Sequence, residues 1–294
     1  MLWEFFFCFI LVFFIYFSFS TVGYAFCSIL NFNNSSKLLY YFIGKCFYIF
    51  AITLFYNYFN FDIQISVYFL IFSFILSLSY ILSKNRYVLI EIFNVFVKFY
   101  FIILLFLFFL AFVYGISFYI FRGNHWDWFS QISLGVIFNH YDYDSFLQIA
   151  NLELINRTEV SPLKVGYPYS KSFFFYGIDG INIKQRLLPS LMMSSIFVFK
   201  NINLYLLAYS LKALFFTSIF PAFYLLIYNF DKSLSRFSIY FVSLAFSLST
   251  WTFYIFEIDA LAQLMAFSLC IILYSVILDV YHRSKDFFFN DLYI

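Results

Sequence analysis

The chain has 294 residues, of which 64% are hydrophobic and only 11% are charged. A soluble domain of this length carries about a quarter charged residues, and its core cannot hide so much apolar surface from water. The composition excludes a water-soluble protein and predicts a lipid bilayer as the solvent, while a formal net charge of +2 offers no basic surface for a nucleic acid.

Seven apolar runs are long enough to cross a bilayer, which takes about 20 residues of helix. In chain order they lie at residues 3–22, 38–59, 63–83, 98–121, 203–229, 237–256 and 258–281. We therefore predict an all-α integral membrane protein with about seven transmembrane helices and one large outer loop that carries short interfacial helices. Its parts are four helices at 1–121, the loop at 122–202, and three helices with a short tail at 203–294.

The connectors between the runs predict the orientation, because Lys and Arg concentrate in cytoplasmic loops. Two connectors, at 83–98 and 229–236, and the C-terminal tail are basic through Lys84, Arg86, Lys98, Lys232, Arg236, His282, Arg283 and Lys285. This pattern places the N-terminus and the 122–202 loop outside and the tail in the cytoplasm. It also places Lys37 and Lys45 near the cytoplasmic end of the second helix.

The loop ends in an apolar tract, "LLPSLMMSSIFVF" at residues 187–199, which is too short to span a bilayer comfortably. Pro189 suits the first turn of a helix. We predict a short helix that lies at the outer membrane surface or dips into it. The alternative is a spanning helix. It would move every later connector to the other side of the membrane, and the basic connectors would then no longer all lie in the cytoplasm.

The loop opens with "HWDWFSQ", in which Asp127 is flanked by Trp126 and Trp128. Tryptophan prefers the membrane interface, so one interpretation is an aromatic belt with a solvated acid. The other is a functional carboxylate, because a low dielectric and aromatic walls raise the pKa of an acid toward the working range of a general base.

A second acidic segment, "NHYDYDSF", places Asp142 and Asp144 two residues apart, with His140 before them. Alternate side chains share one face of an extended segment. These three residues are therefore candidate ligands for a divalent cation, Mg²⁺ or Mn²⁺, which prefers oxygen ligands. A solvated acidic turn is the competing interpretation.

The second half of the loop is basic. Lys171, Lys184 and Arg186, with Lys164 nearby, could bind anionic headgroups or clamp the phosphate of a lipid-linked substrate. Tyr167 and Pro168 indicate a structured turn. Farther on, "YIFEIDALAQ" places Glu257 and Asp259 between the last two predicted helices, where an acid beside the membrane is either functional or simply solvated.

The order of these features resembles the integral-membrane GT-C glycosyltransferase superfamily, which includes protein O-mannosyltransferases and aminoarabinose transferases. The residues that carry the resemblance are His125-Trp126-Asp127 with Ser130, Tyr167-Pro168, and the tract "QRLLPSLMMSSIF". It covers roughly residues 100 to 281. The chain departs from the family in having four predicted helices before the loop and in being shorter than its usual members, so we expect a truncated member.

The resemblance implies a polyprenyl-phosphate sugar as donor and chemistry at the outer face of a bacterial inner (cytoplasmic) membrane. By motif, Asp127 is the catalytic base or a metal contact. His125, Tyr167, Lys171, Lys184, Arg186 and Glu257 are the candidate substrate contacts, and His140, Asp142 and Asp144 the candidate metal ligands. The acceptor would be a glycan, a lipid or a protein.

Two alternatives stay open from the sequence. One is an envelope polysaccharide polymerase or ligase, which is also multi-spanning with a large outer loop. The other is a transporter or assembly protein without enzymatic activity. We expect the predicted helices to lack charged residues, which counts against a transport path.

Overall fold

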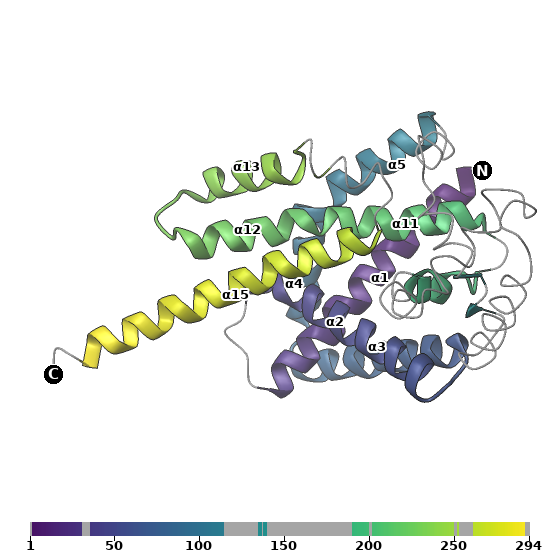
Figure 1. Cartoon of the computed structure of the whole chain (residues 1–294), viewed down its shortest axis with the longest axis horizontal. Coiled ribbons are helices and arrows are strands. Elements are labelled where there is room, and N and C mark those ends of the chain that lie inside the picture. Colours follow the sequence, from purple (N-terminus) through teal and green to yellow (C-terminus); the bar gives the residue numbers. More distant parts are fainter. Residues whose placement is uncertain are drawn as a thin grey trace, which may run out of the picture.

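The computed structural model describes residues 2–30, 36–114, 135–136, 138–139, 190–199, 202–249, 252 and 261–291. These parts of the chain are built from helices that pack side by side (Figure 1). The bounds are α1 Leu2–Ile29, α2 Leu39–Thr53, η1 Leu54–Tyr58, α3 Ile63–Lys84, α4 Tyr87–Phe96, η2 Val97–Phe101, α5 Ile102–Tyr114, α11 Leu204–Thr217, α12 Ile219–Phe230, α13 Arg236–Ser247 and α15 Leu261–Asp291.

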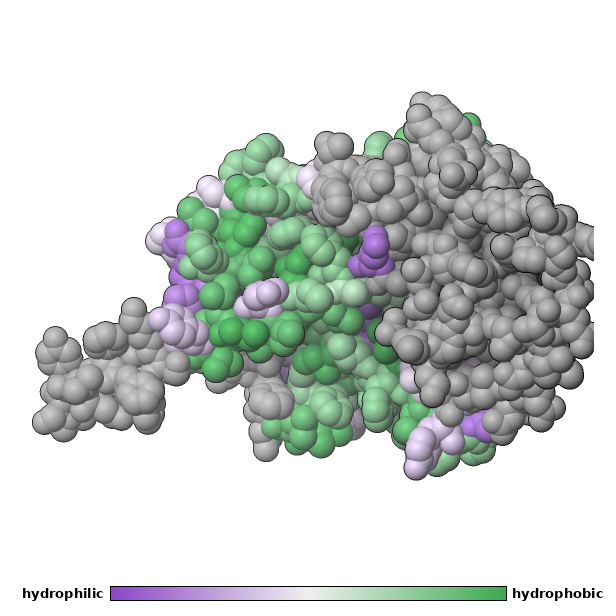
Figure 2. Space-filling model, viewed as in Figure 1, coloured by the Kyte–Doolittle hydropathy of each residue, from purple (hydrophilic) through white to green (hydrophobic). Residues whose placement is uncertain are grey.

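Six helical segments of the described chain are long and apolar enough to cross a membrane. They are Leu2–Ile29, Leu39–Tyr56, Ile63–Lys84, Tyr87–Val113, Leu204–Phe230 and Gln263–His282. Their outward side chains are apolar, and Figure 2 shows a hydrophobic surface over the region of α12, α13 and α15. A surface of this kind is soluble only in lipid, which confirms a multi-pass, all-helical membrane protein.

The fourth span begins earlier than predicted. Residues 83–98 were expected to form a connector, but α4, η2 and α5 follow one another from Tyr87 to Tyr114, and only Asn85 and Arg86 separate α4 from α3. Glu91 lies on α4, in the middle of this predicted connector. In the fold its carboxylate pairs with the ammonium group of Lys37, so the acid lies on a helix without an unpaired charge.

The sixth predicted span, at 237–256, is described only as far as a helix of 12 residues, α13. At 1.5 Å per residue α13 is about 18 Å long, which is too short to cross a bilayer. Helices α12 and α15 run in the same direction, since Phe223 contacts Phe267 and Asn229 bonds to Ser275. The chain must therefore return between them, and α13 begins that return; a total of seven spans stays a prediction.

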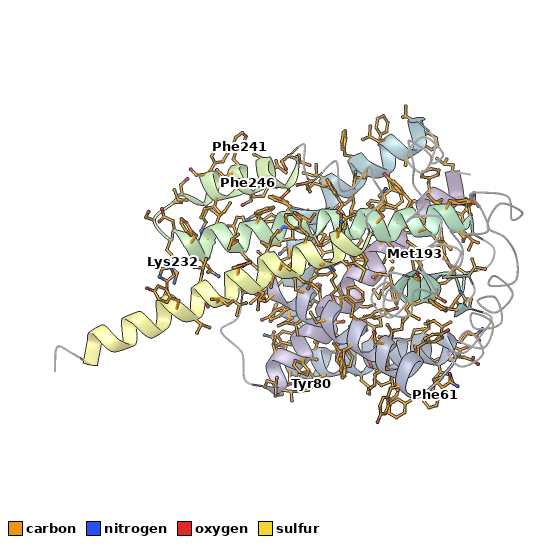
Figure 3. The ribbon with its side chains drawn as sticks, in the orientation of Figure 1. Phe61, Tyr80, Met193, Lys232, Phe241 and Phe246 are labelled. Atoms are coloured by element: carbon orange, nitrogen blue, oxygen red, sulfur yellow. The ribbon has the colours of Figure 1, made fainter. Side chains whose placement is uncertain are left out.

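The turn between α12 and α13 is held by two local side-chain caps. Asp231 accepts hydrogen bonds from the backbone N–H of Ser233 at 2.9 Å and from its hydroxyl at 2.6 Å. These bonds stabilise the carboxylate and hold the pKa of Asp231 below its usual value. Ser235 then caps α13 by accepting from the N–H of Ser238. The polar turn at Lys232 lies at the left of Figure 3.

The core lies along α11 and the first half of α12, where nearly every side chain from Leu206 to Ala222 is buried. This long segment changes from α11 to α12 at Ser218. Pro221 explains the break, because proline lacks an N–H and its ring collides with the carbonyl group of the residue four positions earlier. The other helices pack around this segment.

Two glycines allow α1 and α2 to cross at close range. A Cβ atom on Gly23 would collide with the backbone of Tyr40, and a Cβ atom on Gly44 would collide with the carbonyl oxygen of Phe19. Small residues are used in this way between membrane helices, because packing rather than water exclusion drives their association.

The fold gathers the basic connectors at one end of the bundle. The ends of α1 and α3 meet there through the hydroxyls of Ser28 and Tyr80, 2.9 Å apart. The long α11–α12 segment runs antiparallel to the fourth span, since Tyr209 bonds to the carbonyl of Leu107 and Tyr224 packs on Phe99. The residues that share this end are Lys37, Lys84, Arg86, Lys232 and Arg236.

The ends of α5 and α11 that flank the predicted loop lie at the opposite end of the bundle. Phe112, near the end of α5, contacts Phe5 at the start of α1. The fourth span and α11 are antiparallel, so Leu204, at the start of α11, lies at the same end of the bundle as Phe112. This arrangement agrees with the predicted alternation, and the side of the membrane that each end faces stays a prediction.

Residues 190–196 form a short helix, as predicted, but the helix does not lie on the surface. Its side chains from Ser190 to Ile196 are at most 5% exposed. Tyr48, midway along α2, donates a hydrogen bond of 2.9 Å to Ser195, and Figure 3 places Met193 within the bundle. The sequence "SLMMSSI" is apolar or small on every side, which suits a fully buried helix rather than an amphipathic interfacial one.

We predict that Gly44→Leu lowers the stability of the protein by about 1–3 kcal/mol or more, because the new side chain collides with α1 at the crossing. The matched control is Cys46→Leu, two residues along the same helix at an exposed position. Thermal unfolding of the detergent-solubilised variants measures the effect. Equal unfolding temperatures for the two variants would contradict the close crossing.

The orientation predicts opposite accessibility for two introduced cysteines. In a background without native cysteines, Ser233→Cys at the basic end should react with a membrane-impermeant thiol reagent only from the cytoplasm. Ser130→Cys, in the predicted outer loop, should react only from outside. Labelling of intact cells and inside-out vesicles measures both, and the reverse pattern would invert the topology.

Candidate functional site

The site residues predicted from the sequence all lie outside the described residues. They are His125, Asp127, His140, Asp142, Asp144, Tyr167, Lys171, Lys184, Arg186 and Glu257. The structure neither brings them together nor separates them, so their roles stay predictions. The helix ends that flank most of them lie at the end of the bundle opposite to the basic connectors.

The described helices contain a buried charge instead. Lys45 lies on α2, six residues after its start, and its side chain is 0% exposed. Its ammonium group donates to the carbonyl oxygen of Met265 at 3.3 Å and to the hydroxyl of Ser268 at 3.0 Å, both on α15. The same nitrogen lies 4.5 Å from the ring centre of Phe215 on α11. Lys45 therefore joins three helices at one point.

No carboxylate among the described residues lies within ion-pair distance of Lys45. Its partners are a carbonyl group, a hydroxyl group and an aromatic ring, which together stabilise a cation but do not neutralise it. A charged side chain in the centre of a spanning helix costs several kcal/mol, roughly 2.5–3.5 on insertion scales. Charged groups in such positions usually serve a function, so Lys45 is the first candidate that the structure adds.

A cluster of tyrosines continues the polar face of α2. Tyr41 is one turn before Lys45 on this helix, and its ring centre lies 5.4 Å from that of Tyr16 on α1 and 5.4 Å from that of Tyr100 on η2. Tyr16 donates to the carbonyl of Ile92 at 3.2 Å. The Tyr100 hydroxyl has no hydrogen-bond partner in the described part of the chain.

The Tyr41 hydroxyl lies beside Ser218, at the break between α11 and α12, but without a hydrogen bond of standard geometry. Buried hydroxyl groups almost always have partners. Two of them without good partners, Tyr41 on the helix of Lys45 and Tyr100 in contact with the Tyr41 ring, indicate a place where polar atoms of another molecule would be stabilised.

The π-helical segment η2 contributes to this cluster. A π turn widens the helix and frees a carbonyl group, and such turns are frequent at functional sites. Here the carbonyl of Lys98 accepts a hydrogen bond of 3.1 Å from Tyr240 on α13. The same turn places Tyr100 against Tyr41 and Tyr16.

Lys212, on α11, is a second lysine within the spans, with a side chain 1% exposed. It lies three residues before Phe215, and residues at this spacing share one face of a helix. The expectation that the spans lack charged residues is therefore wrong for α2 and α11. A signal was present in the sequence, since "GKCF" and "SLKALF" interrupt apolar runs with lysine, but we had assigned Lys45 to the helix end.

The arrangement is suited to binding an anion. Lysine ammonium and tyrosine hydroxyl groups are hydrogen-bond donors, and in a low dielectric the attraction between a cation and a phosphate is strong. Among the described residues, no three His, Cys, Asp or Glu side chains are grouped as metal ligands. The predicted metal ligands lie in the part of the chain that is not described.

Comparisons of the chain with protein-family models, with curated proteins and with solved structures find no match.

We predict that Lys45→Met folds with an unfolding temperature equal to or above that of the wild type, because methionine fills a similar volume without a charge to bury. Ser268→Ala should instead lower the stability by about 1–3 kcal/mol, because it removes an acceptor and leaves the buried ammonium group poorly paired.

The matched control is Ser243→Ala on α13, whose hydroxyl bonds only to a carbonyl of its own helix. Thermal unfolding of the three variants in one detergent tests the interpretation. Destabilisation by Lys45→Met, together with no effect of Ser268→Ala, would show that Lys45 acts by packing alone.

Proposed function

We propose that this protein is a membrane glycosyltransferase that moves a sugar from a polyprenyl-phosphate donor to an envelope acceptor at the non-cytoplasmic face of a bacterial inner membrane. The observation that carries the proposal is the buried cation Lys45, without a carboxylate partner among the described residues and with the poorly paired Tyr41 hydroxyl one turn before it on α2. The phosphate group of a lipid carrier is an anion that these hydrogen-bond donors could bind, and the lipid part of the carrier keeps it next to the spans.

The predicted loop residues would perform the transfer. Asp127 removes the proton from the acceptor hydroxyl, whose oxygen then forms a bond to the anomeric carbon of the sugar. The bond between that carbon and the phosphate oxygen breaks, and polyprenyl phosphate leaves. Arg186, with Lys171 or Lys184, stabilises the negative charge that develops on the leaving phosphate.

The remaining predicted residues have supporting roles. Asp142, Asp144 and His140 would hold a divalent cation, which adds positive charge beside the phosphate. His125, Tyr167 and Glu257 would contact the donor or the acceptor. In this proposal the lipid carrier approaches from the bilayer, so that its phosphate meets the loop and its chain remains between lipids and helices.

A second candidate is a transporter or assembly protein for an anionic envelope precursor. It is favoured by Lys45 and Lys212, because charged residues inside spans often mark the path of a substrate. The two candidates differ in product. A glycosyltransferase changes the acceptor covalently, whereas a transporter moves a labelled substrate across a sealed vesicle without changing it.

We predict that Asp127→Asn lowers the rate of sugar transfer by roughly 100-fold or more, since it removes the general base. The assay follows labelled sugar from a polyprenyl-phosphate donor into acceptor in vesicles that contain the purified protein. The matched control is Asp231→Asn in the turn at the basic end, which should keep wild-type activity. Normal transfer by Asp127→Asn would remove this residue from the mechanism, and vesicle transport without transfer would favour the second candidate.

A further inference from the structure

An apolar cavity lies between α1, α2, α3 and the 190–196 helix. Its volume is about 110 Å³, whereas a cavity needs roughly 10–15 Å³ on the same measure to hold one water molecule. Side chains from all four segments line it, including Leu11, Ile15, Phe47, Leu70, Phe74 and Ile196. The space fits a run of several methylene groups and is too small for a whole lipid.

The cavity offers no free hydrogen-bonding side chain. Three polar side chains line it, and each is already bonded within the protein. Ser18 donates to the carbonyl of Phe14 at 2.8 Å, Tyr48 donates to Ser195 at 2.9 Å, and Ser195 donates to the carbonyl of Met192 at 2.7 Å. A polar ligand or a water cluster would lose hydrogen bonds on entering, so the occupant must be a hydrocarbon.

The cavity is at the depth of the bilayer centre. Ile15, Phe47 and Phe74 lie near the midpoints of the spans Leu2–Ile29, Leu39–Tyr56 and Ile63–Lys84. The cavity also opens sideways, because its lining includes Phe14 and Ile71, which are 44% and 43% exposed on helix faces that contact lipid. Its mouth is therefore surrounded by the middle segments of lipid chains.

We infer that this cavity binds the middle segment of one acyl chain of a bilayer phospholipid. Acyl chains are the bulk solvent at this depth, and mass action favours the most abundant species that fits. Phe14 and Phe74, which line the cavity, are in edge-to-face contact with their ring centres 5.2 Å apart, so they narrow the mouth and leave no gap between the two rings. A linear chain fits beside such rings more easily than the methyl-branched chain of a polyprenyl carrier.

The acyl chain in this cavity would be distinct from any lipid-linked substrate of the protein. Gly44 lines the cavity, whereas its neighbour Lys45 faces α11 and α15 on another side of α2. The inference therefore holds whether or not the protein is a glycosyltransferase. Its physical consequence concerns the 190–196 helix, because a chain in the cavity contacts Ser195, Ile196 and Phe199 and adds apolar contacts that hold this short helix against α1 and α3.

The test uses the purified full-length protein in phosphatidylcholine vesicles that contain a phosphatidylcholine with a photoreactive diazirine at the middle of one acyl chain. After extraction into mild detergent, which removes bulk lipid, irradiation labels only retained chains. Mass spectrometry should locate the label on cavity residues of α1, α2 and α3. Leu70→Trp, which fills the cavity, should lower this labelling at least fivefold and lower the unfolding temperature in lipid.

The matched control is Leu76→Trp, on the same helix at a position 54% exposed and outside the cavity, which should leave labelling unchanged. Val67→Trp is a second filling variant in case Leu70→Trp does not fold. Equal labelling of the wild type and both filling variants would overturn the inference. Loss of the phosphatidylcholine label to an equimolar amount of unlabelled polyprenyl phosphate would overturn the choice of an acyl chain.

Discussion

Every polar group inside a membrane protein needs a partner from the protein itself, because the surrounding hydrocarbon supplies none. In the described part of the chain, the helices provide hydrogen-bond partners for most backbone N–H and C=O groups. Side-chain hydroxyl groups then join neighbouring helices by donating hydrogen bonds to backbone carbonyl groups. Tyr209 bonds to α5, Tyr240 bonds to η2, and Tyr16 bonds to α4. These bonds fix the rotation of each helix, and the many phenylalanine rings then pack between the helices in edge-to-face contacts. Lys45, which has no carboxylate partner among the described residues, and the poorly paired hydroxyl groups of Tyr41 and Tyr100 therefore have reason to serve a function.

Helix α2 shows how one segment can serve several neighbours. Gly44 lets its backbone approach α1, Lys45 reaches across to α15, and Tyr48 holds the 190–196 helix. Successive residues of a helix point about 100° apart, so a tight crossing, a cation and an apolar cavity can follow one another within two turns. The proposed anion site and the proposed acyl-chain site are therefore close in sequence while they face different partners.

The membrane class, the helical fold and six of the seven predicted spans follow from hydropathy, because a run of apolar residues has no other stable environment than lipid. The start of the fourth span was predicted too late, because Lys84, Arg86 and Lys98 were taken to mark one connector. In the fold this stretch is helical, and its acid Glu91 is compensated by Lys37 from a distant part of the chain. The sixth predicted span is described only as a short helix. The short 190–196 helix was correctly placed in sequence. Of its two predicted positions, on the membrane surface or dipping into it, the first is wrong, since its burial depends on α1 and α2 and on the hydroxyl of Tyr48.

By itself, the sequence determined the solvent of this protein, the helical conformation of its long apolar runs and the chemical character of the polar segment around Asp127. Each of these depends on local composition or on a short motif. Only the tertiary structure decided that Lys45 is enclosed by α11 and α15, that Tyr41 and Tyr100 meet, and that a hydrocarbon-lined cavity opens between α1 and α3. Lys45 is separated from Ser268 by more than two hundred residues, and no local pattern encodes which helices will surround a side chain.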